Sequence, residues 1–251
     1  MAEVNEFDGQ TVLVGGGAGE IGAAVARRFA RLGATVSIAD VNEDRGRDVA
    51  RELRALTASS EFVQVDLTRQ SEVERWVQGV LARSGQIHVA VNTTGWTESS
   101  YFVDEDDAYW RRMIDINLMS CLYLAHAVIP SMTRHRYGRI VLVSASSCRV
   151  GRAKRAIYVT TKAGVVGFSK SLAREVAEDG ITVNGVAPGS TETARLMRED
   201  TDGSRRSLSD IPIGKRASTE DHAHAVCFLA SGSAGQITGQ TIAVDGGTTM
   251  I

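Results

Sequence analysis

The sequence predicts an α/β protein built on a doubly wound parallel sheet of about seven strands, with helices on both faces. Short β-rich runs alternate with long amphipathic stretches from one end of the chain to the other. Continuous apolar runs such as Val12-Leu13-Val14 suit strands that helices bury on both sides. The first of these runs passes through a glycine-rich turn directly into a helical stretch, a connection typical of such sheets.

The expected elements follow one another without a long linker. The strands are the β-rich runs at Thr11–Val14, Thr35–Ala39, Phe62–Val65, Ile87–Val91, Arg139–Ser144, Ile181–Val186 and Thr241–Val244. The helical patterns cover about residues 20–32, 43–57, 70–84, 106–136, 156–179 and 219–231. The chain has three prolines and no low-complexity segment, so residues 1–251 are expected to form a single domain.

Composition limits the classes of function. The 251 residues are 43% hydrophobic and 23% charged with a formal net charge of -2, which indicates a globular protein without a nucleic-acid or membrane partner. Cys121, Cys148 and Cys227 are far apart and lack CxxC spacing, so we expect no disulfide framework, no metal and a cytoplasmic location. The polar N-terminus is unlike a signal peptide, and no apolar run approaches the length of a membrane span. His222 and His224 are expected on the surface rather than at a metal.

The glycine-rich turn predicts a phosphate-binding site. Residues 15–22, with the sequence GGGAGEIG, lead from a strand into a helix. The N-terminus of that helix offers free N–H groups and positive dipole to a pyrophosphate, and the glycines permit its close approach. The residues expected to bind it are Gly16, Gly19, Ile21 and Gly22.

Acidic residues after the next two strands indicate the nucleotide. Asp40 can accept both ribose hydroxyls of NAD and would repel the 2′-phosphate of NADP, and neighbouring Val41 is neutral. The alternative is that Asp40 is the N-cap of the following helix. Asp66 and Leu67 are placed to meet the adenine, although Asp66 equally suits a turn before its helix. We therefore predict NAD as the cofactor.

Tyr158-Val159-Thr160-Thr161-Lys162 places a phenol and an ammonium on one helix face, because residues at i and i+4 are neighbours there. A cation beside the ring favours the phenolate and pulls a pKa near 10 toward neutrality. Such a tyrosine can exchange a proton with an alcohol. The same pair is more often plain helix surface, and the other motifs decide between these interpretations.

The ordered motifs resemble those of the short-chain dehydrogenase/reductase family. They are the glycine-rich turn, Asp40, Asn92-Thr93-Thr94-Gly95, Asn117, Tyr158-xxx-Lys162 and Pro188-Gly189. The likeness extends from about residue 8 to 247 and implies a Rossmann fold and oxidoreductase activity. Segments 92–96, 149–151 and 168–170 are similar to 2-hydroxycyclohexanecarboxyl-CoA dehydrogenases, and the chain also resembles 3-oxoacyl reductase-like members.

The resemblance implies a role for each motif. Tyr158 would be the general acid/base, and Lys162 would lower its pKa and hold the nicotinamide ribose. Asn117 would anchor a water in the proton relay, unless it is an ordinary polar residue of its helix. The remaining cofactor contacts would come from Asn92, Gly95, Pro188, Gly189, Thr191 and Thr193, of which the last four would cover the nicotinamide and bind its carboxamide.

Three positions depart from the family. Gly15 replaces a threonine that braces the turn, and Glu20 replaces a glycine; we expect its carboxylate to turn outward. The serine that hydrogen-bonds the substrate oxygen belongs at position 145, which is Ala145. Ser144 and Ser146 would face the opposite side of a regular strand, but a bend would bring Ser146 into the catalytic set. Loss of that donor would lower the rate on the order of 10²–10³-fold.

A basic loop, defined by Arg149, Arg152, Lys154 and Arg155, precedes Tyr158. It suggests capture of an anionic substrate, such as a carboxylate, a sulfonate or a CoA thioester. The alternative is a solvated or subunit-contacting loop. Arg195 and Arg198 would line the same mouth, and the polar stretch 190–215 is expected to be a mobile substrate lid.

These observations favour an NAD-dependent oxidoreductase that interconverts a secondary alcohol and a ketone, with a cyclic or anionic substrate as one option. The alternative is an NAD-binding sensor or scaffold subunit with little turnover, which Ala145 and Glu20 would suit. A sugar-nucleotide epimerase or dehydratase ranks last, because the chain lacks the extra C-terminal domain of such enzymes. By resemblance, the long helices at 106–136 and 156–179 are expected to pair across subunits in a homotetramer.

Overall fold

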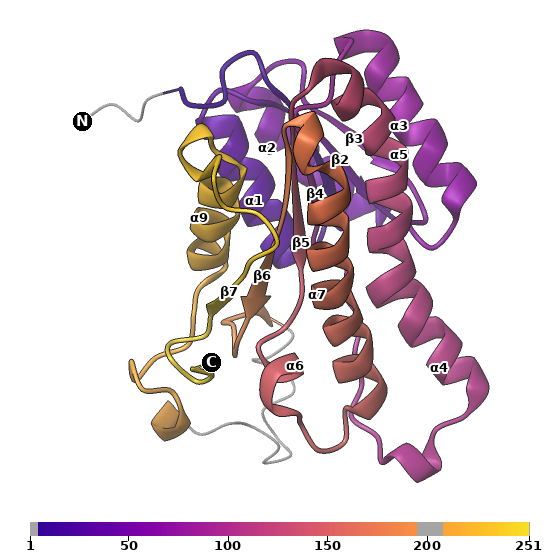
Figure 1. Cartoon of the computed structure of the whole chain (residues 1–251), viewed down its shortest axis with the longest axis vertical. Helices are drawn as coiled ribbons and strands as arrows, with labels where there is room; N and C mark the ends of the chain where they lie inside the picture. Colours follow the sequence, from indigo (N-terminus) through magenta and orange to yellow (C-terminus); the bar gives the residue numbers. More distant parts are fainter. Residues whose placement is uncertain (1–4, 195–207, 251) are drawn as a thin grey trace.

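The computed structural model describes residues 5–194 and 208–250. Its centre is a sheet of seven parallel strands in the order β3-β2-β1-β4-β5-β6-β7 (Figure 1). The strands are β1 (Thr11–Gly15), β2 (Thr35–Asp40), β3 (Glu61–Gln64), β4 (Val89–Asn92), β5 (Gly138–Val143), β6 (Ile181–Pro188) and β7 (Thr241–Val244). The predicted doubly wound sheet is confirmed, and all seven strands lie where the sequence places them.

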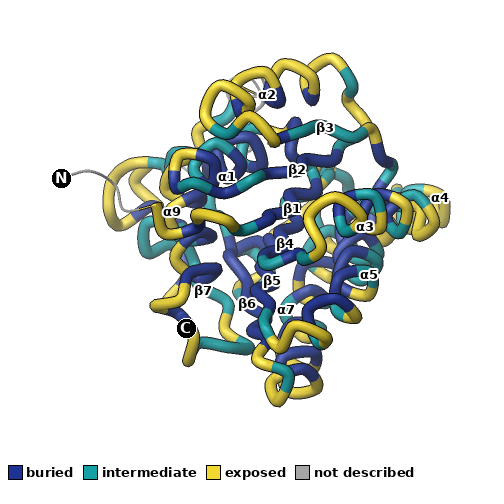
Figure 2. The backbone as a smooth tube through the Cα atoms, turned by 90° about the horizontal axis from the view of Figure 1, so that it is seen from above, coloured by how far each residue is buried: buried dark blue, intermediate teal, exposed yellow. Residues whose placement is uncertain are grey.

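Helices cover both faces of the sheet (Figure 2). One layer contains α1 (Glu20–Arg31), α2 (Glu43–Leu56) and α9 (Thr219–Ala230), and the other α3 (Gln70–Ser84), α4 (Asp107–Ile114), α5 (Ser120–His135) and α7 (Ala156–Val176). Alternate residues of a strand enter different layers: Val12 and Val14 pack with α1 and α9, whereas Leu13 packs with α3 and α5. Every central strand is therefore buried on both sides.

The strand order positions the functional site. The chain leaves β1 toward β2 on one side of the sheet and continues from β4 outward on the other. The connections that follow β1 and β4 therefore diverge and leave a crevice at the carboxyl ends of the strands. The glycine-rich turn, the loop after β4 and the loop after β5 all begin at this edge.

The helix expected over residues 106–136 contains a π-helical turn, η2 (Asp115–Met119), between α4 and α5. Asn117 lies in this turn, and its Nδ2 donates to the Met113 carbonyl at 3.0 Å and to the Trp96 carbonyl at 2.8 Å. Such turns are rare and frequently accompany functional sites. The short helical segments η1 (Phe102–Asp104), α6 (Ser147–Val150), η3 (Ala177–Asp179), η4 (Leu208–Asp210) and η5 (Gly232–Ala234) complete the described structure.

Two expectations about the surface need correction. His222 is fully buried, because it lies on the face of α9 that packs into the fold, whereas His224 is exposed as expected. The stretch Asp107–His135 is long and apolar enough to cross a membrane by length and composition alone, with a mean hydropathy of 1.4 over 18 residues. In the fold, the α5 part of this stretch packs against the sheet through Leu124 and Val128. A core helix of this kind has the same length and apolar composition as a membrane-spanning helix.

Candidate active site

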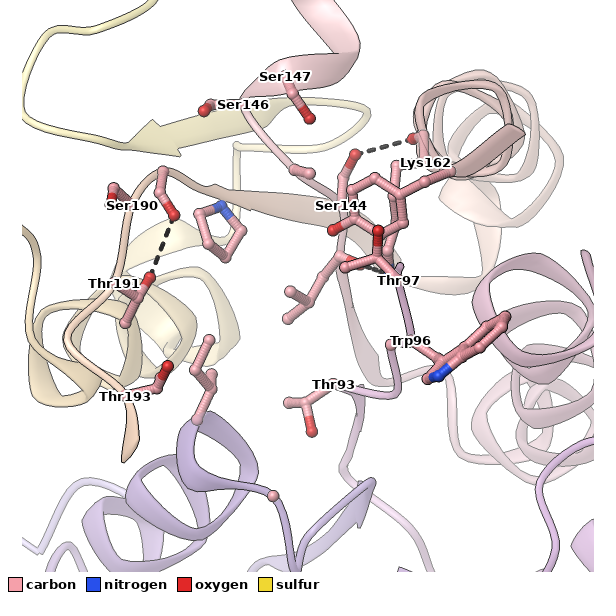
Figure 3. Close-up of a pocket in the computed structure, with 18 of the residues that line it drawn as sticks. Thr93, Trp96, Thr97, Ser144, Ser146, Ser147, Lys162, Ser190, Thr191 and Thr193 are labelled. Atoms are coloured by element: carbon pink, nitrogen blue, oxygen red, sulfur yellow. Dashed lines mark hydrogen bonds between the residues drawn. The ribbon is translucent and has the colours of Figure 1, made fainter. Parts of the chain in front are cut away.

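A cavity of about 460 Å³ opens at the carboxyl ends of the strands (Figure 3). Its walls come from the glycine-rich turn, the loop after β4, the end of β5 with α6, the start of α7 and the segment after β6. The lining residues are Gly16, Gly19, Glu20, Ile21, Gly22, Thr93, Gly95, Trp96, Thr97, Val143, Ser144, Ala145, Ser146, Ser147, Arg152, Arg155, Tyr158, Lys162, Pro188, Gly189, Ser190, Thr191 and Thr193. Most of the predicted site residues are thus brought together.

The glycine-rich turn has the backbone geometry that a pyrophosphate requires. Gly16 has a φ of 74°, and a Cβ at Gly22 would lie 2.2 Å from the Gly16 carbonyl oxygen. Gly19 is the N-cap of α1 and offers no side-chain cap, which leaves the first N–H groups of the helix available to an anion. Thr93 Oγ1 donates to the Gly15 carbonyl at 2.8 Å. Thr93, which the sequence did not single out, therefore braces the turn where Gly15 lacks a side chain.

Glu20 does not turn outward as expected. Its side chain lines the cavity, and both carboxylate oxygens lie 3.0 Å from the backbone N of Ala194. The carboxylate thus joins the start of α1 to the segment that follows β6. This contact satisfies the charge with an N–H donor rather than leaving it against the pyrophosphate site.

Asp40 is oriented toward the glycine-rich turn. Its Oδ2 accepts from the N–H of Ala18 at 3.1 Å and its Oδ1 from the N–H of Asn42 at 3.0 Å. Asn42, not Asp40, is the side-chain N-cap of α2, which removes the capping alternative. Arg45 was missed by sequence reasoning: its Nε donates to the Ala18 carbonyl at 3.1 Å. A cation from α2 therefore lies at the same turn as the Asp40 carboxylate.

Five predicted cofactor residues lie outside the cavity walls: Asp40, Val41, Asp66, Leu67 and Asn92. Asp66 forms the turn that was its alternative interpretation, since its Oδ1 accepts from the N–H of Thr68 at 3.0 Å. Asn92 is fully buried and accepts from the N–H of Thr94 at 2.8 Å, so it shapes the loop after β4. Val41 and Leu67 flank the ends of β2 and β3, where the adenine end of a dinucleotide is expected.

Lys162 and Tyr158 stand one turn apart on α7 and both line the cavity. Lys162 is 2% exposed, and its Nζ donates to the carbonyls of Val143 at 2.9 Å and Thr94 at 3.1 Å. Burial lowers the pKa of the Lys162 ammonium. The half-buried Tyr158 and the desolvated cation of Lys162 thus border the same cavity.

Asn117 acts on the loop after β4. Its Oδ1 accepts from the N–H of Trp96 at 3.1 Å, while its Nδ2 donates to the Trp96 carbonyl. A Cβ at Gly95 would lie 3.5 Å from Asn117 Oδ1 and 3.6 Å from Lys162 Nζ. The fully buried amide therefore fixes the loop next to the lysine, and its two N–H donors are used by backbone carbonyls.

The end of β5 presents three serines around Ala145. Ser144 Oγ donates to the Lys162 carbonyl at 2.8 Å. Pairing with β6 continues through the Ser146 N–H, which donates to the Pro188 carbonyl at 2.9 Å, and the chain turns into α6 only there. Ser146 and Ser147 both line the cavity. In Figure 3 the Ser147 hydroxyl points toward the side where Ser144 and Lys162 lie, and the Ser146 hydroxyl points the other way.

The segment after β6 forms the opposite wall. A Cβ at Gly189 would lie 2.4 Å from the Cβ of Asp245, so a larger residue cannot take this place without displacing the backbone. Thr191 Oγ1 lies 2.8 Å from Nε2 of His222. Burial lowers the pKa of His222 to about 4. Thr193 lines the same wall, so all four predicted nicotinamide residues border the cavity.

The basic loop divides into residues inside and outside the site. Arg149 Nη2 donates to the Thr241 carbonyl, and Lys154 Nζ lies 4.8 Å from the Tyr101 ring centroid. Arg152 and Arg155 line the cavity. Arg195, Arg198 and the middle of the expected lid (195–207) lie outside the described residues.

Comparisons with known proteins agree with this architecture. A family model described as enoyl-(acyl carrier protein) reductase matches residues 16–249. The 3-oxoacyl-[acyl-carrier-protein] reductase FabG of Escherichia coli (strain K12) is 36% identical over 245 residues, which cover 98% of this chain and 99% of that protein. The protein of the same description from Thermotoga maritima is 32% identical over 241 residues, 96% of this chain and 98% of the relative. The solved structure of a short-chain type dehydrogenase/reductase from Mycobacterium ulcerans has a TM-score of 0.92 and 29% identity, covering 97% of this chain and 90% of that one.

The fold and site therefore define an oxidoreductase that acts on CH–OH groups. The chain belongs to the short-chain dehydrogenase/reductase family, as its ordered motifs predicted.

Proposed function

We propose that this protein is an NAD-dependent enzyme that interconverts a secondary alcohol and a ketone, with Tyr158 as the general acid/base. The observation that carries this proposal is the position of the Tyr158 ring on the cavity wall, one helical turn from the buried ammonium of Lys162. A protein that only bound the nucleotide would have no use for a phenol tuned in this way.

Each residue of the site has its own role in the proposed reaction. NAD, when bound, would accept a hydride from the carbinol carbon, and its reduced form would return it. Tyr158 takes the proton of the alcohol hydroxyl in oxidation and gives it to the carbonyl oxygen in reduction. Lys162, held by two backbone carbonyls, stabilises the phenolate. The turn at Gly16 and the N-terminus of α1 hold the pyrophosphate, and Asn117 keeps the loop after β4 in place with any water that serves the relay.

Two substrate classes follow from different observations. The curated relatives are described as 3-oxoacyl-[acyl-carrier-protein] reductases, which makes an acyl thioester ketone one candidate. The cations on the cavity wall support the other, a cyclic or open-chain substrate with its own anionic group.

We place the enzyme in the cytoplasm without a membrane or nucleic-acid partner, on the basis of its composition. The low-turnover alternative rests on Ala145 alone, because the Glu20 carboxylate is satisfied by Ala194.

A direct test is a screen of nicotinamide reduction at 340 nm. Wild-type protein would be mixed with NAD and secondary alcohols: cyclic and acyclic, neutral and acidic, and 3-hydroxyacyl thioesters. The Tyr158→Phe protein is the matched control, since its fold and cofactor site are retained. We expect turnover that disappears in the control. Tight NAD binding without turnover of any alcohol, or of any ketone with NADH, would instead support the sensor or scaffold function.

The choice of nucleotide is tested separately. Asp40 would repel the 2′-phosphate of NADP, so we expect a lower dissociation constant for NAD by calorimetry, and Asp40→Ala should narrow the difference. Arg45 bonds the same turn and can attract that phosphate. Adding Arg45→Gln to the Asp40→Ala variant should therefore weaken NADP binding a few-fold, as expected for an exposed charge pair. Equal or tighter binding of NADP by the wild-type protein would contradict the assignment of NAD.

A further inference from the structure

Arg155 is a cation inside the cavity that the proton and hydride transfers do not use. It is the residue before α7, is half-buried, and lines the cavity three residues before Tyr158. Its Nη1 donates to Thr97 Oγ1 at 3.2 Å, and its Cζ lies 6.0 Å from the centroid of the Tyr158 ring. The guanidinium is therefore oriented by one neutral hydroxyl and placed beside the reacting phenol.

Arg155 has no acidic partner in the described part of the chain. No carboxylate oxygen there lies within 4.0 Å of its nitrogens, although eight other arginine–carboxylate contacts meet this criterion. Glu20 is the acidic residue on the cavity wall, but it belongs to α1 and is bound to the N–H of Ala194. Lys162 lies on the same wall as Arg155, so among these three side chains the positive charges outnumber the single carboxylate.

The cofactor does not account for this cation. The pyrophosphate site is at the glycine-rich turn and the start of α1, and the 2′-phosphate position is beyond Asp40, at the end of β2. Arg155 instead stands at the entrance of α7, where the substrate must lie to reach Tyr158. A guanidinium matches a planar or tetrahedral oxyanion with two parallel hydrogen bonds, and the bond to Thr97 leaves most of its five donors for a ligand.

We propose that Arg155 forms an oxyanion subsite, so that the enzyme acts on short hydroxy acids, carboxylic or sulfonic, and on the corresponding keto acids. This proposal rests on the alcohol–ketone activity proposed above. Because Arg155 adjoins the Tyr158 ring, the anion lies only a few bonds from the carbinol carbon. The phosphates of a CoA thioester are many bonds from the reacting carbonyl, so they do not fit this subsite.

The experiment compares matched charged and neutral substrates. The acids are 3-hydroxybutanoate, 2-hydroxycyclohexanecarboxylate and 2-hydroxypropanesulfonate; the neutral partners are the methyl esters of the two carboxylic acids, and 3-hydroxybutanoyl-CoA is included. Wild-type enzyme should prefer at least one acid over its neutral partner. Arg155→Gln should lower kcat/KM for that acid about 10- to 100-fold, mainly through KM, as the loss of a charge-assisted hydrogen bond does. The ester should change less than about threefold, and Arg155→Lys should recover part of the loss.

Lys154→Gln is the control, since this neighbouring cation lies on the Tyr101 ring outside the cavity; it should leave both substrates unchanged. A second readout needs no turnover: the acid should raise the melting temperature of NAD-saturated wild-type and Tyr158→Phe proteins, but not of Arg155→Gln. Failure of the proposed activity would leave this shift in place. Equal turnover of acid and ester, an equal loss on both in Arg155→Gln, or turnover of the CoA thioester alone would overturn the subsite.

Discussion

The effect that we propose for Lys162 on Tyr158 depends on the burial of the lysine. Its ammonium donates to the carbonyls of Val143 and Thr94. These groups carry no net charge, so the two contacts do not neutralise the positive charge of the lysine. Burial lowers the pKa of Lys162, so its charge, and with it the support of the phenolate, is lost at a lower pH than for a free lysine. Alcohol oxidation should accordingly decline on the alkaline side below the usual lysine range near 10.4.

Removing the phenol should nearly eliminate turnover. Tyr158→Phe deletes the group that carries the proton, so we expect kcat to fall by roughly 10²–10⁴-fold while the NAD dissociation constant stays close to that of the wild type. Lys162→Ala should weaken both, because the ammonium would touch the nicotinamide ribose as well as the phenol. Stopped-flow turnover and calorimetric titration separate the two effects. A Tyr158→Phe enzyme with more than about a tenth of wild-type kcat would rule out this role.

The donor to the substrate oxygen is a choice between two serines. Sequence reasoning selected Ser146, yet strand pairing persists to that residue and its hydroxyl points away from Lys162 (Figure 3). The hydroxyl of Ser147, two residues beyond Ala145, points toward that side and has no hydrogen-bond partner among the described residues. We therefore expect Ser147→Ala to lower kcat on the order of 10²-fold, with a smaller effect for Ser146→Ala.

Ala145→Ser distinguishes the remaining outcomes. If Ser147 already supplies the hydrogen bond, a hydroxyl restored at position 145 should add little to kcat. If both alanine variants keep full activity and Ala145→Ser raises kcat strongly, the natural enzyme works without this donor. A loss confined to Ser146→Ala would show instead that the choice made from the sequence was right.

At the scale of elements, the sequence predicts what depends on the hydrophobic period and misses what depends on individual hydrogen bonds between distant residues. Strands such as β1 and helices such as α3 follow directly from apolar periodicity. The π-helical turn does not, because it depends on the Asn117 amide, which bonds Trp96 from a distant loop. The short helix α6 and the inward Ser147 escape prediction for a different reason, since a four-residue segment carries no detectable period. Cavity residues such as Gly16 and Lys162 were found because a motif assigned them a role, whereas the bonds of Thr93 and Arg45 to backbone carbonyls could not be read from the motifs.

The contact between α9 and the segment after β6 predicts a pH dependence of stability. His222 is buried against Thr191, and burial lowers its pKa from 6.5 to about 4. As the pH falls, His222 therefore binds a proton in the unfolded chain at a higher pH than in the folded protein. The contribution of His222 to stability is fully present above pH 6.5 and is lost as the pH falls toward 4. The maximum loss is about 3 kcal/mol. In urea unfolding experiments, the free energy of unfolding of the wild-type protein should decrease between pH 7 and pH 4.5. His222→Gln should remove the part of this decrease that comes from protonation of His222. An equally steep decrease in the variant would assign the acid sensitivity to other groups.

At the scale of the whole molecule, the two long helices expected at the subunit interface lie in the outer layer on one side of the sheet (Figure 2). The surface of α7 is smooth in places: Ala163 and Gly167 are exposed, and Phe168 beside them is only partly buried. On α4 the apolar Ile114 is 39% exposed, and near the C-terminus Met250 is 76% exposed. Small and apolar side chains that are exposed on long helices favour helix–helix packing against a second copy of the chain.

We therefore predict a homotetramer, with a mass by light scattering near four times the 26.9 kDa of the chain at micromolar concentration. Gly167→Glu tests whether α7 is the interface. Nothing lies within 4 Å of a Cβ at Gly167, so the substitution meets no neighbour within one chain. It should nevertheless reduce the tetramer to dimers or monomers, because four copies would bury the added charges. Gly79→Glu on α3 is the matched control, since its Cβ would meet only the flexible end of Arg83, and it should remain tetrameric. A wild-type monomer would refute the assembly, and a tetramer unaffected by Gly167→Glu would move the interface away from this face of α7.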